Sequence, residues 1–379
     1  MIDDPTDPAA GDRERLTPPP IPQPVRLREL DPSLPPPPAA TASTASATGV
    51  AATTPPPIPR LGSIAGLSSS PWLHVVLFLA TLATTTLAGA FGAGENPFVS
   101  PPALLAGLPF SLTLLAILFS HEMGHWLLAR HHRVPTSLPY FIPAPPFLVG
   151  TFGAFIRMRG TPRSRQALFD IGAAGPWAGF VVALPAIMLG LAWSEVRPLE
   201  ASAALGLSFG NSILFAGLTQ LILGVHPDDV TILLHPVALA GWFGLFVTFL
   251  NLLPVGQLDG GHVAYALFGR SHRWIARLFM GVLLVLGIQG WDGWFLWVFL
   301  LAFVIRVDHP DTADRETPLD RRRKLAAWLT VLLFVLTFMP EPLILMDEDQ
   351  AAIAPGHERE APRPQPQQAP DPANGLLAT

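Results

Sequence analysis

Residues 108–130 read LPFSLTLLAILFSHEMGHWLLAR, and this stretch decides the fold. The run is long enough for a membrane-spanning helix, which needs roughly 20 predominantly apolar residues. Three ionisable side chains nevertheless lie inside it: His121, Glu122 and His125. A charged side chain at the bilayer centre costs about 2.5 kcal/mol or more. These side chains therefore either bind something, or the segment is not a membrane helix.

The composition of the whole chain favours the membrane interpretation. Of the 379 residues, 50% are hydrophobic and only 13% are charged, and the mean hydropathy is +0.41. Soluble domains carry about 25% charged residues. There is no cysteine, which excludes disulfides and thiolate metal sites, so any metal must be held by His, Asp, Glu or Asn. We therefore expect an all-α polytopic membrane protein.

Seven apolar runs predict about seven transmembrane helices. They are residues 71–92, 108–130, 171–193, 236–254, 274–289, 291–305 and 325–345. The run at residues 211–225 is shorter, and we expect it to be interfacial or re-entrant. Lysine and arginine gather in the loops on one side of this arrangement, which predicts a cytoplasmic N-terminus.

The two ends of the chain differ from its middle. Residues 1–70 contain proline runs such as TPPPIPQP and LPPPP, and residues 347–379 are polar and also rich in proline. Proline at this density blocks helix and sheet, so we expect two disordered tails. Between them, residues 71–346 form the expected transmembrane domain, with its motifs at residues 119–269.

Residues 134–160 do not fit a helix, because five prolines interrupt the segment. Its second half includes FLVGTFGAFIRM at residues 147–158, which is apolar, aromatic and contains glycine. This pattern predicts a short strand pair or a re-entrant loop. Irregular backbone at membrane depth is tolerated only against protein or water, so we expect the segment to line a cavity near the ionisable residues.

The sequence HEMGH at residues 121–125 has the spacing of a metal site on a helix. Residues at i and i+4 share one helix face, so His121 and His125 can hold one ion. Glu122 is turned about 100° away and can act as general base towards a water at an open coordination position. The pattern arises by chance in roughly one such sequence in a hundred. Structural histidines and a haem site remain alternatives.

A second polar cluster lies in FLNLLPVGQLDGGHV at residues 249–263. His121 precedes Arg130 by 9 residues and Asp259 precedes Arg270 by 11, so both lie roughly 14–16 Å from the cytoplasmic edge if helical. This common depth makes Asp259 a candidate third ligand, although it is also a good helix cap. Asn251 can hold a peptide carbonyl or an oxyanion, or can pair with a backbone group freed by proline.

The other histidines have less specific expectations. His262 is adjacent to the second cluster and is expected to be interfacial rather than a neighbour of Asp259. The histidines in loops or near chain ends, including His132, are expected to be solvated.

The motifs HEMGH and NLLPVGQLDGG (residues 251–261) resemble those of the site-2 protease family of intramembrane zinc metalloproteases. The resemblance implies that His121, His125 and Asp259 bind zinc, that Glu122 is the catalytic base, and that Asn251 helps to position the substrate. The stretches FIPAPP to GTFGAFIRMRG and DIGAAGPWAGF are also similar to the branch without a PDZ domain. It further implies hydrolysis of peptide bonds within or near transmembrane helices.

Two other functions remain open at this point: a membrane zinc transporter and a catalytically inactive membrane scaffold. Iron or cobalt could also occupy the same ligands. The expected partners are a membrane-protein substrate and the lipid bilayer, and no nucleic acid. The proline-rich, cysteine-free composition suggests a bacterial inner membrane.

Overall fold

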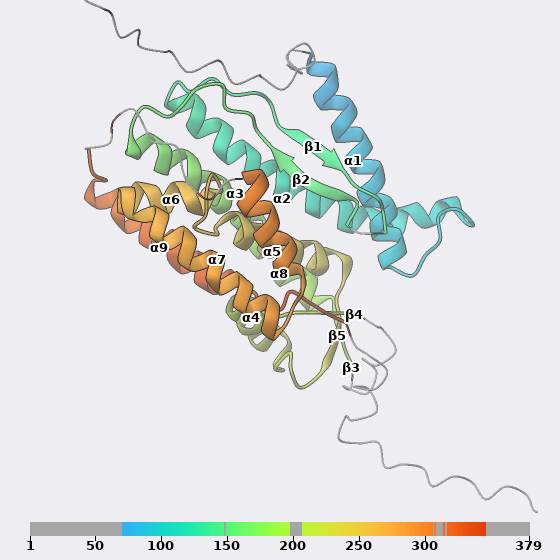
Figure 1. Ribbon diagram of the computed structural model, residues 1–379. Coiled ribbons are helices and arrows are strands. Elements are labelled where there is room, and N and C mark those ends of the chain that lie inside the picture. The colour runs from blue at the N-terminus through green and yellow to red at the C-terminus, as the bar shows by residue number, and fades with distance from the viewer. Residues whose placement is uncertain are drawn as a thin grey trace, which may run out of the picture. The chain divides into compact units, whose positions relative to one another are not determined.

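The structure is a computed structural model that describes residues 70–147, 149–197, 207–305, 307, 314 and 317–345. These residues are mostly helical (Figure 1). The helices are α1 (Pro71–Gly92), η2 (Pro101–Ala103), α2 (Leu104–His131), α3 (Arg165–Ala192), α4 (Ile213–Leu223), α5 (Pro236–Asn251), α6 (Asp259–Phe268), η4 (Gly269–Ser271), α7 (His272–Gln289), α8 (Gly293–Phe299), η5 (Leu300–Ile305) and α9 (Arg321–Thr337). The expected tails at residues 1–70 and 347–379 lie outside the described residues, apart from Ser70.

Four helical stretches of the described chain are long and apolar enough to cross a membrane, which identifies an integral membrane protein. They are Pro71–Gly92, Pro101–His131, Arg165–Ala192 and Asp259–Gln289. Three further apolar helices are shorter: Ile213–Leu223, Pro236–Asn251 and Gly293–Ile305. The predicted number of about seven spans is therefore not confirmed, and the supported number for the described residues is four.

The break between α5 and α6 explains part of this difference. The expected run at residues 236–254 ends as a helix at Asn251, because residues 252–258 form a turn around Pro254. Leu253 and Val255 are fully buried in this turn. The Val255 amide donates to the Leu253 carbonyl at 2.8 Å, and the Gly256 amide donates to the Val307 carbonyl at 3.1 Å. Protein contacts thus satisfy an irregular segment inside an apolar run.

Helix α3 is the centre of the helical packing and contacts α2, α5 and α6. Small residues allow the backbones to approach closely at these contacts. A side chain at Gly124 of α2 would collide with the Ala174 carbonyl of α3, and one at Gly190 of α3 would collide with Ala238 of α5. Small residues at such interfaces are typical of helices packed in membranes. The N-terminus of α3 is fixed by the Ser164 hydroxyl, which accepts from the Ala167 amide at 3.2 Å.

The strand pair expected at residues 147–158 is present in part: β2 (Thr151–Phe155) lies there, but its partner is β1 (Tyr140–Pro143), which precedes that stretch. The strands are antiparallel and include the cross-strand pair Tyr140 and Phe155. Figure 1 shows the hairpin beside α1, and it contacts both α1 and α2. The Thr84 hydroxyl of α1 donates to the Gly150 carbonyl at 2.6 Å, where the chain turns with φ +80°. This contact ties the hairpin to a membrane helix.

The remaining elements lie away from the hairpin. Two further antiparallel pairs are formed by β3 (Glu195–Arg197) with β5 (Thr231–Leu233) and by β4 (Leu207–Phe209) with β6 (Leu343–Leu345). Helix α4 has only 11 residues, which agrees with the expectation that residues 211–225 do not form a full span.

Candidate metal centre

The two histidines of HEMGH lie on one face of α2, as their spacing predicts. Both are buried, at 4% and 7% exposure for His121 and His125. Their Nε2 atoms are 3.1 Å apart. Two imidazole nitrogens at this distance can share either a proton or a cation, and in the second case both would be ligands of one ion.

Asp259 completes a triangle with these two nitrogens. Its Oδ2 atom lies 3.2 Å from Nε2 of His121 and 3.2 Å from Nε2 of His125. Tetrahedral zinc with nitrogen and oxygen ligands at about 2.0–2.1 Å separates those ligand atoms by roughly 3.3–3.4 Å. The observed triangle therefore fits a small tetrahedral cation. Among the described residues these three form one candidate group for a metal ion, with its ligand atoms within 4.8 Å of one another.

The position of Asp259 weakens its alternative role as a helix cap. Leu258 occupies the N-cap of α6, where no side chain accepts a capping hydrogen bond, and Asp259 is the first helical residue. Its carboxylate points instead to two histidines on α2, more than a hundred residues earlier in the chain. The common depth deduced from the two apolar runs corresponds to this contact.

A backbone carbonyl of α3 orients one of the two imidazoles. Nδ1 of His125 donates to the Ile171 carbonyl at 2.7 Å. Because a carbonyl only accepts, the proton sits on Nδ1, which leaves the Nε2 lone pair free for a metal. No residue type in the sequence marks this contact, since every residue has a carbonyl.

Glu122 lies in the same cavity but outside the ligand triangle. It is 5% exposed and lines a cavity of about 200 Å³ with the two histidines, Asn251 and Asp259. The backbone amide of Ile156, which follows β2, hydrogen-bonds to its carboxylate. Glu122 therefore lies between the candidate metal ligands and the hairpin.

Asn251 ends helix α5 and points at the same centre. Its Nδ2 atom lies 3.3 Å from Nε2 of His121. Its amide therefore faces the ligand group rather than a backbone group near Pro254. His262, expected at the interface, is instead buried and lines the cavity. The reason is that α6 turns this residue towards α3, where a side chain at Gly172 would collide with it.

Glycines of α3 make room for the imidazoles. A Cβ atom at Gly175 would overlap the ring of His125, and one at Gly179 would lie 3.2 Å from Cβ of His121. His125 can therefore occupy its position only because α3 has a glycine there, and His121 packs closely against a second glycine. The sequence analysis did not predict these contacts.

Gly175→Ala is expected to reduce zinc affinity at least tenfold. The new methyl group must displace the His125 ring, which would move Nε2 out of the triangle, and losses of 10–100-fold follow even from disturbing groups behind a ligand. Zinc retained against a competing chelator measures this. Gly281→Ala on α7, where a Cβ atom meets nothing within 4 Å, is the matched control. Equal zinc affinity of the two variants would contradict the geometry.

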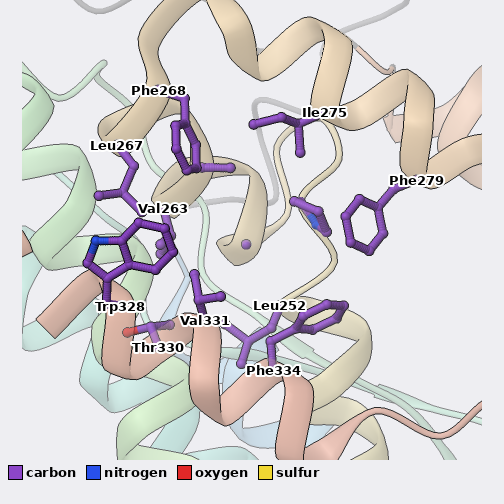
Figure 2. Close-up of a pocket in the computed structure, with 13 residues that line it drawn as sticks. Leu252, Val263, Leu267, Phe268, Ile275, Phe279, Trp328, Thr330, Val331 and Phe334 are labelled. Carbon is purple, nitrogen blue, oxygen red and sulfur yellow. The ribbon is translucent and has the colours of Figure 1, made fainter. Parts of the chain in front are cut away.

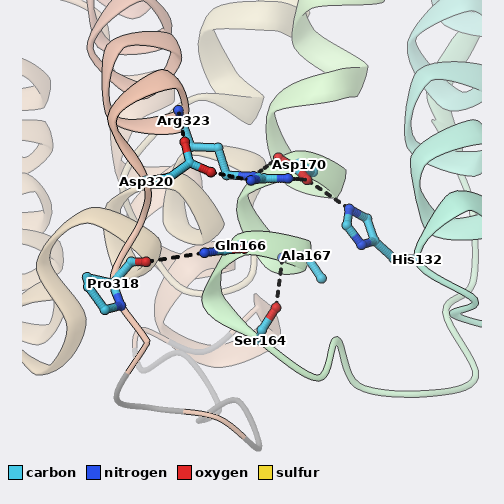
Figure 3. A network of polar contacts seen from close by, with 8 residues as sticks. All are labelled: His132, Ser164, Gln166, Ala167, Asp170, Pro318, Asp320 and Arg323. Atoms are coloured by element: carbon cyan, nitrogen blue, oxygen red, sulfur yellow. Dashed lines mark hydrogen bonds and ion pairs between the residues drawn. The ribbon is translucent and has the colours of Figure 1, made fainter.

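An ion-pair network holds α3 one residue before the Ile171 carbonyl (Figure 3). Asp170 accepts from Nε2 of His132 at 2.8 Å and from two guanidinium nitrogens of Arg323 at 2.8 and 2.7 Å. Arg323 also pairs with Asp320, the N-cap of α9. The network joins α2, α3 and α9. His132 is therefore paired rather than solvated as expected, because α3 brings a carboxylate to it.

Comparison with known proteins adds a family match over the same part of the chain. Residues 109–288 match the model of Peptidase family M50. The chain is 32% identical over 243 residues to "Probable zinc metalloprotease EGY1, chloroplastic" of Oryza sativa subsp. japonica, covering 63% of this chain and 42% of the relative. It is 33% identical over 248 residues to the EGY1 protein of Arabidopsis thaliana, covering 63% and 44%.

A third relative is "Probable zinc metalloprotease EGY2, chloroplastic" of Oryza sativa subsp. indica, which is 34% identical over 245 residues and covers 62% of this chain and 43% of the relative. The chain thus spans less than half the length of these relatives. Their names assign them to the chloroplast, which conflicts with the expected bacterial inner membrane. The integral membrane location itself rests on the four candidate spans.

Proposed function

We propose that residues 109–288, which match the model of Peptidase family M50, form a site-2 protease domain and that the chain is an intramembrane zinc metalloprotease. Its substrates would be membrane proteins, cleaved within or near their transmembrane helices. The observation that carries the proposal is the convergence of His121, His125 and Asp259 at 3.1–3.2 Å, with Glu122 in the same cavity but outside the triangle.

The donor set fits zinc, and each residue has a defined task. His121 and His125 offer neutral imidazole nitrogens and Asp259 offers a carboxylate oxygen, which leaves one tetrahedral position open. When bound, zinc polarises the scissile carbonyl and lowers the pKa of a water towards 7. The Glu122 carboxylate takes the proton of the attacking water and then gives it to the leaving amine nitrogen. The Asn251 amide donates to the carbonyl oxygen as negative charge develops there.

The experiment that tests this proposal uses the purified full-length protein and a membrane-embedded reporter in liposomes. We expect a chelator to abolish cleavage and added zinc to restore it. Magnesium, which prefers oxygen ligands, should not restore it. Cleavage that survives complete removal of zinc would refute the proposal. Zinc that crosses the bilayer without reporter cleavage would support the transporter alternative instead.

Strand β2 supports a proposal for how an unwound substrate is held. The Arg157 amide and carbonyl both bond towards Ser137 on the β1 side, so by alternation the amides of Ala154 and Ile156 point to the opposite edge. That edge lies on the cavity, where both residues are part of the wall. A substrate segment can add to this edge as an extra strand. The peptide bonds of the substrate segment would then lie beside Glu122.

Ala154→Pro is expected to lower reporter cleavage about threefold to tenfold while leaving the zinc content unchanged. The variant loses one amide donor on the free edge, and a hydrogen bond contributes roughly 0.5–1.5 kcal/mol. Ala154→Ser keeps the amide and serves as the matched control. The measurement is the initial rate of cleavage together with zinc analysis of the same sample. Unchanged cleavage by Ala154→Pro would contradict strand addition at this edge.

Orientation in the membrane forms the last part of the proposal. The loops that carry most lysines and arginines are expected on the cytoplasmic side, so the N-terminus would lie there as well. Because the chain has no cysteine, single cysteines can be introduced at Ser70 and at Asp292. Their access to a cysteine-directed reagent would test on which side of the membrane each residue lies.

A further inference from the structure

A second cavity lies beside the candidate metal centre, between α6, α7 and α9 (Figure 2). Its volume is about 250 Å³. The wall includes Val263 and Phe268 from α6, Ile275 and Phe279 from α7, and Val331 and Phe334 from α9. In Figure 2 these side chains surround a common space. Helices α6 and α7 both belong to the candidate membrane span Asp259–Gln289, and α9 contributes its apolar residues to the wall.

The chemistry of the wall excludes a peptide segment as the occupant. The lining is almost entirely apolar, and its polar side-chain groups are the Thr330 hydroxyl and the indole N–H of Trp328. The Thr330 hydroxyl donates to the Ala326 carbonyl at 2.9 Å and accepts from Nε1 of Trp177 at 2.9 Å. An extended peptide here would leave its amides and carbonyls unpaired, at a cost of several kcal/mol for each group. The part of the occupant inside the cavity must therefore lack donors and acceptors that need hydrogen-bonding partners.

The form of the cavity suits a narrow chain. Side chains from three helices bound a space of about 250 Å³. A hydrocarbon chain can enter such a space and has no groups that need hydrogen-bonding partners.

Positive charge lies at one end of the cavity. Lys324 stands four residues before Trp328 and seven before Val331, so all three share one face of α9. Arg270 follows Phe268 at the end of α6, and the rings of Phe268 and Trp328 meet at 6.2 Å between centroids. This contact brings the two chain segments together. Both basic side chains are exposed, and their long apolar stems can reach an interfacial phosphate.

We propose that this cavity binds one acyl chain of an anionic phospholipid whose phosphate is held by Lys324 and Arg270. Basic pockets between membrane helices are suited to such head groups. The chain would pack against Leu252, Pro254 and Gly260, which belong to the cavity wall. Leu252 follows Asn251 and Gly260 follows Asp259, so the lipid would support the turn that positions both residues.

The test uses the full-length protein in nanodiscs with a photoactivatable diazirine on the acyl chain of either phosphatidylglycerol or phosphatidylcholine. We expect phosphatidylglycerol to label residues of the cavity wall. Lys324→Gln and Arg270→Gln should each lower this labelling about fivefold and leave labelling by phosphatidylcholine unchanged. Val331→Trp, which fills the cavity, should remove wall labelling. Leu278→Trp on the lipid-exposed face of α7 is its matched control.

Each alternative result has a defined meaning. Equal wall labelling by the two lipids, insensitive to Lys324→Gln and Arg270→Gln, would overturn the assignment of an anionic head group. Wall labelling that persists in Val331→Trp would overturn the acyl-chain site. Because Lys324 and Arg270 are exposed, their variants keep the test valid even if Val331→Trp fails to fold. The readout is independent of proteolysis, so it stands apart from the proposed enzyme activity.

Discussion

Asp259→Ala is expected to lose zinc, with an affinity at least about 100-fold lower than that of the wild-type protein. Residues behind a metal ligand contribute factors of 10–100, so removal of one of three direct ligands should exceed that range. The Oδ2 atom is 3.2 Å from both imidazole nitrogens, and no other described carboxylate joins this group. Cleavage should fall with the zinc content.

The measurement is zinc affinity by competition with a chromophoric chelator. Gln257→Ala is the matched control, because Gln257 lies on the same turn and lines the same cavity without belonging to the ligand group. It should bind zinc as the wild type does. Near-normal zinc affinity in Asp259→Ala would show that the third ligand is another residue and would contradict a metal site shared by α2 and α6.

Glu122→Gln is expected to retain zinc and to lose cleavage by a factor of about 100 to 10,000. The substitution removes the charge and the proton-accepting oxygen but keeps the size, and general acid–base catalysis contributes about this factor. The Gln side-chain oxygen can still accept from the Ile156 amide, so the local structure should persist. Zinc content and reporter cleavage are measured on the same preparation.

This variant also separates the competing functions. A transporter needs its metal ligands and can tolerate loss of a group outside them, so zinc movement across liposomes would continue. A protease cannot proceed without the base. Cleavage at a rate near that of the wild type would exclude Glu122 as the general base, even if all three ligands held zinc.

The arrangement of site residues within one helix could be predicted from the sequence, and the contacts between distant segments could be predicted only in part. His121 and His125 share a helix face because of the 3.6-residue period, which is a property of any helix. Asp259 was paired with them by counting depth from the basic edges of two runs and by the resemblance of its motif to that of the site-2 protease family. The structure brings these three residues together and adds Asn251 from α5.

The contacts that escaped prediction involve backbone groups or missing side chains. The Ile171 carbonyl orients His125, the Ile156 amide reaches Glu122, and Gly175 makes room for an imidazole. None of these has a residue-type signature in one sequence. The pairing of His132 with Asp170 depends on the packing of α2 against α3, which periodicity does not specify.

For the fold, too, some features were predicted from the sequence and others were not. Because prolines exclude a helix at residues 134–160, a strand pair or a re-entrant loop was predicted there, although the first strand begins earlier than residue 147. The number of spans was not, because the turn at residues 252–258 is stabilised by buried side chains and by the carbonyl of Val307. A hydropathy window detects apolar length and does not detect a turn that the surrounding protein satisfies.

The most direct test of the central claim is the zinc-edge X-ray absorption spectrum of the purified protein. We predict two imidazole nitrogens and carboxylate oxygen at about 2.0–2.1 Å. The spectrum should change in Asp259→Ala and stay the same in Glu122→Gln. Three results would contradict a metal held between α2 and α6 with Glu122 outside it. They are a zinc coordination shell without two imidazoles, a spectrum that does not change in Asp259→Ala, and a spectrum that changes in Glu122→Gln.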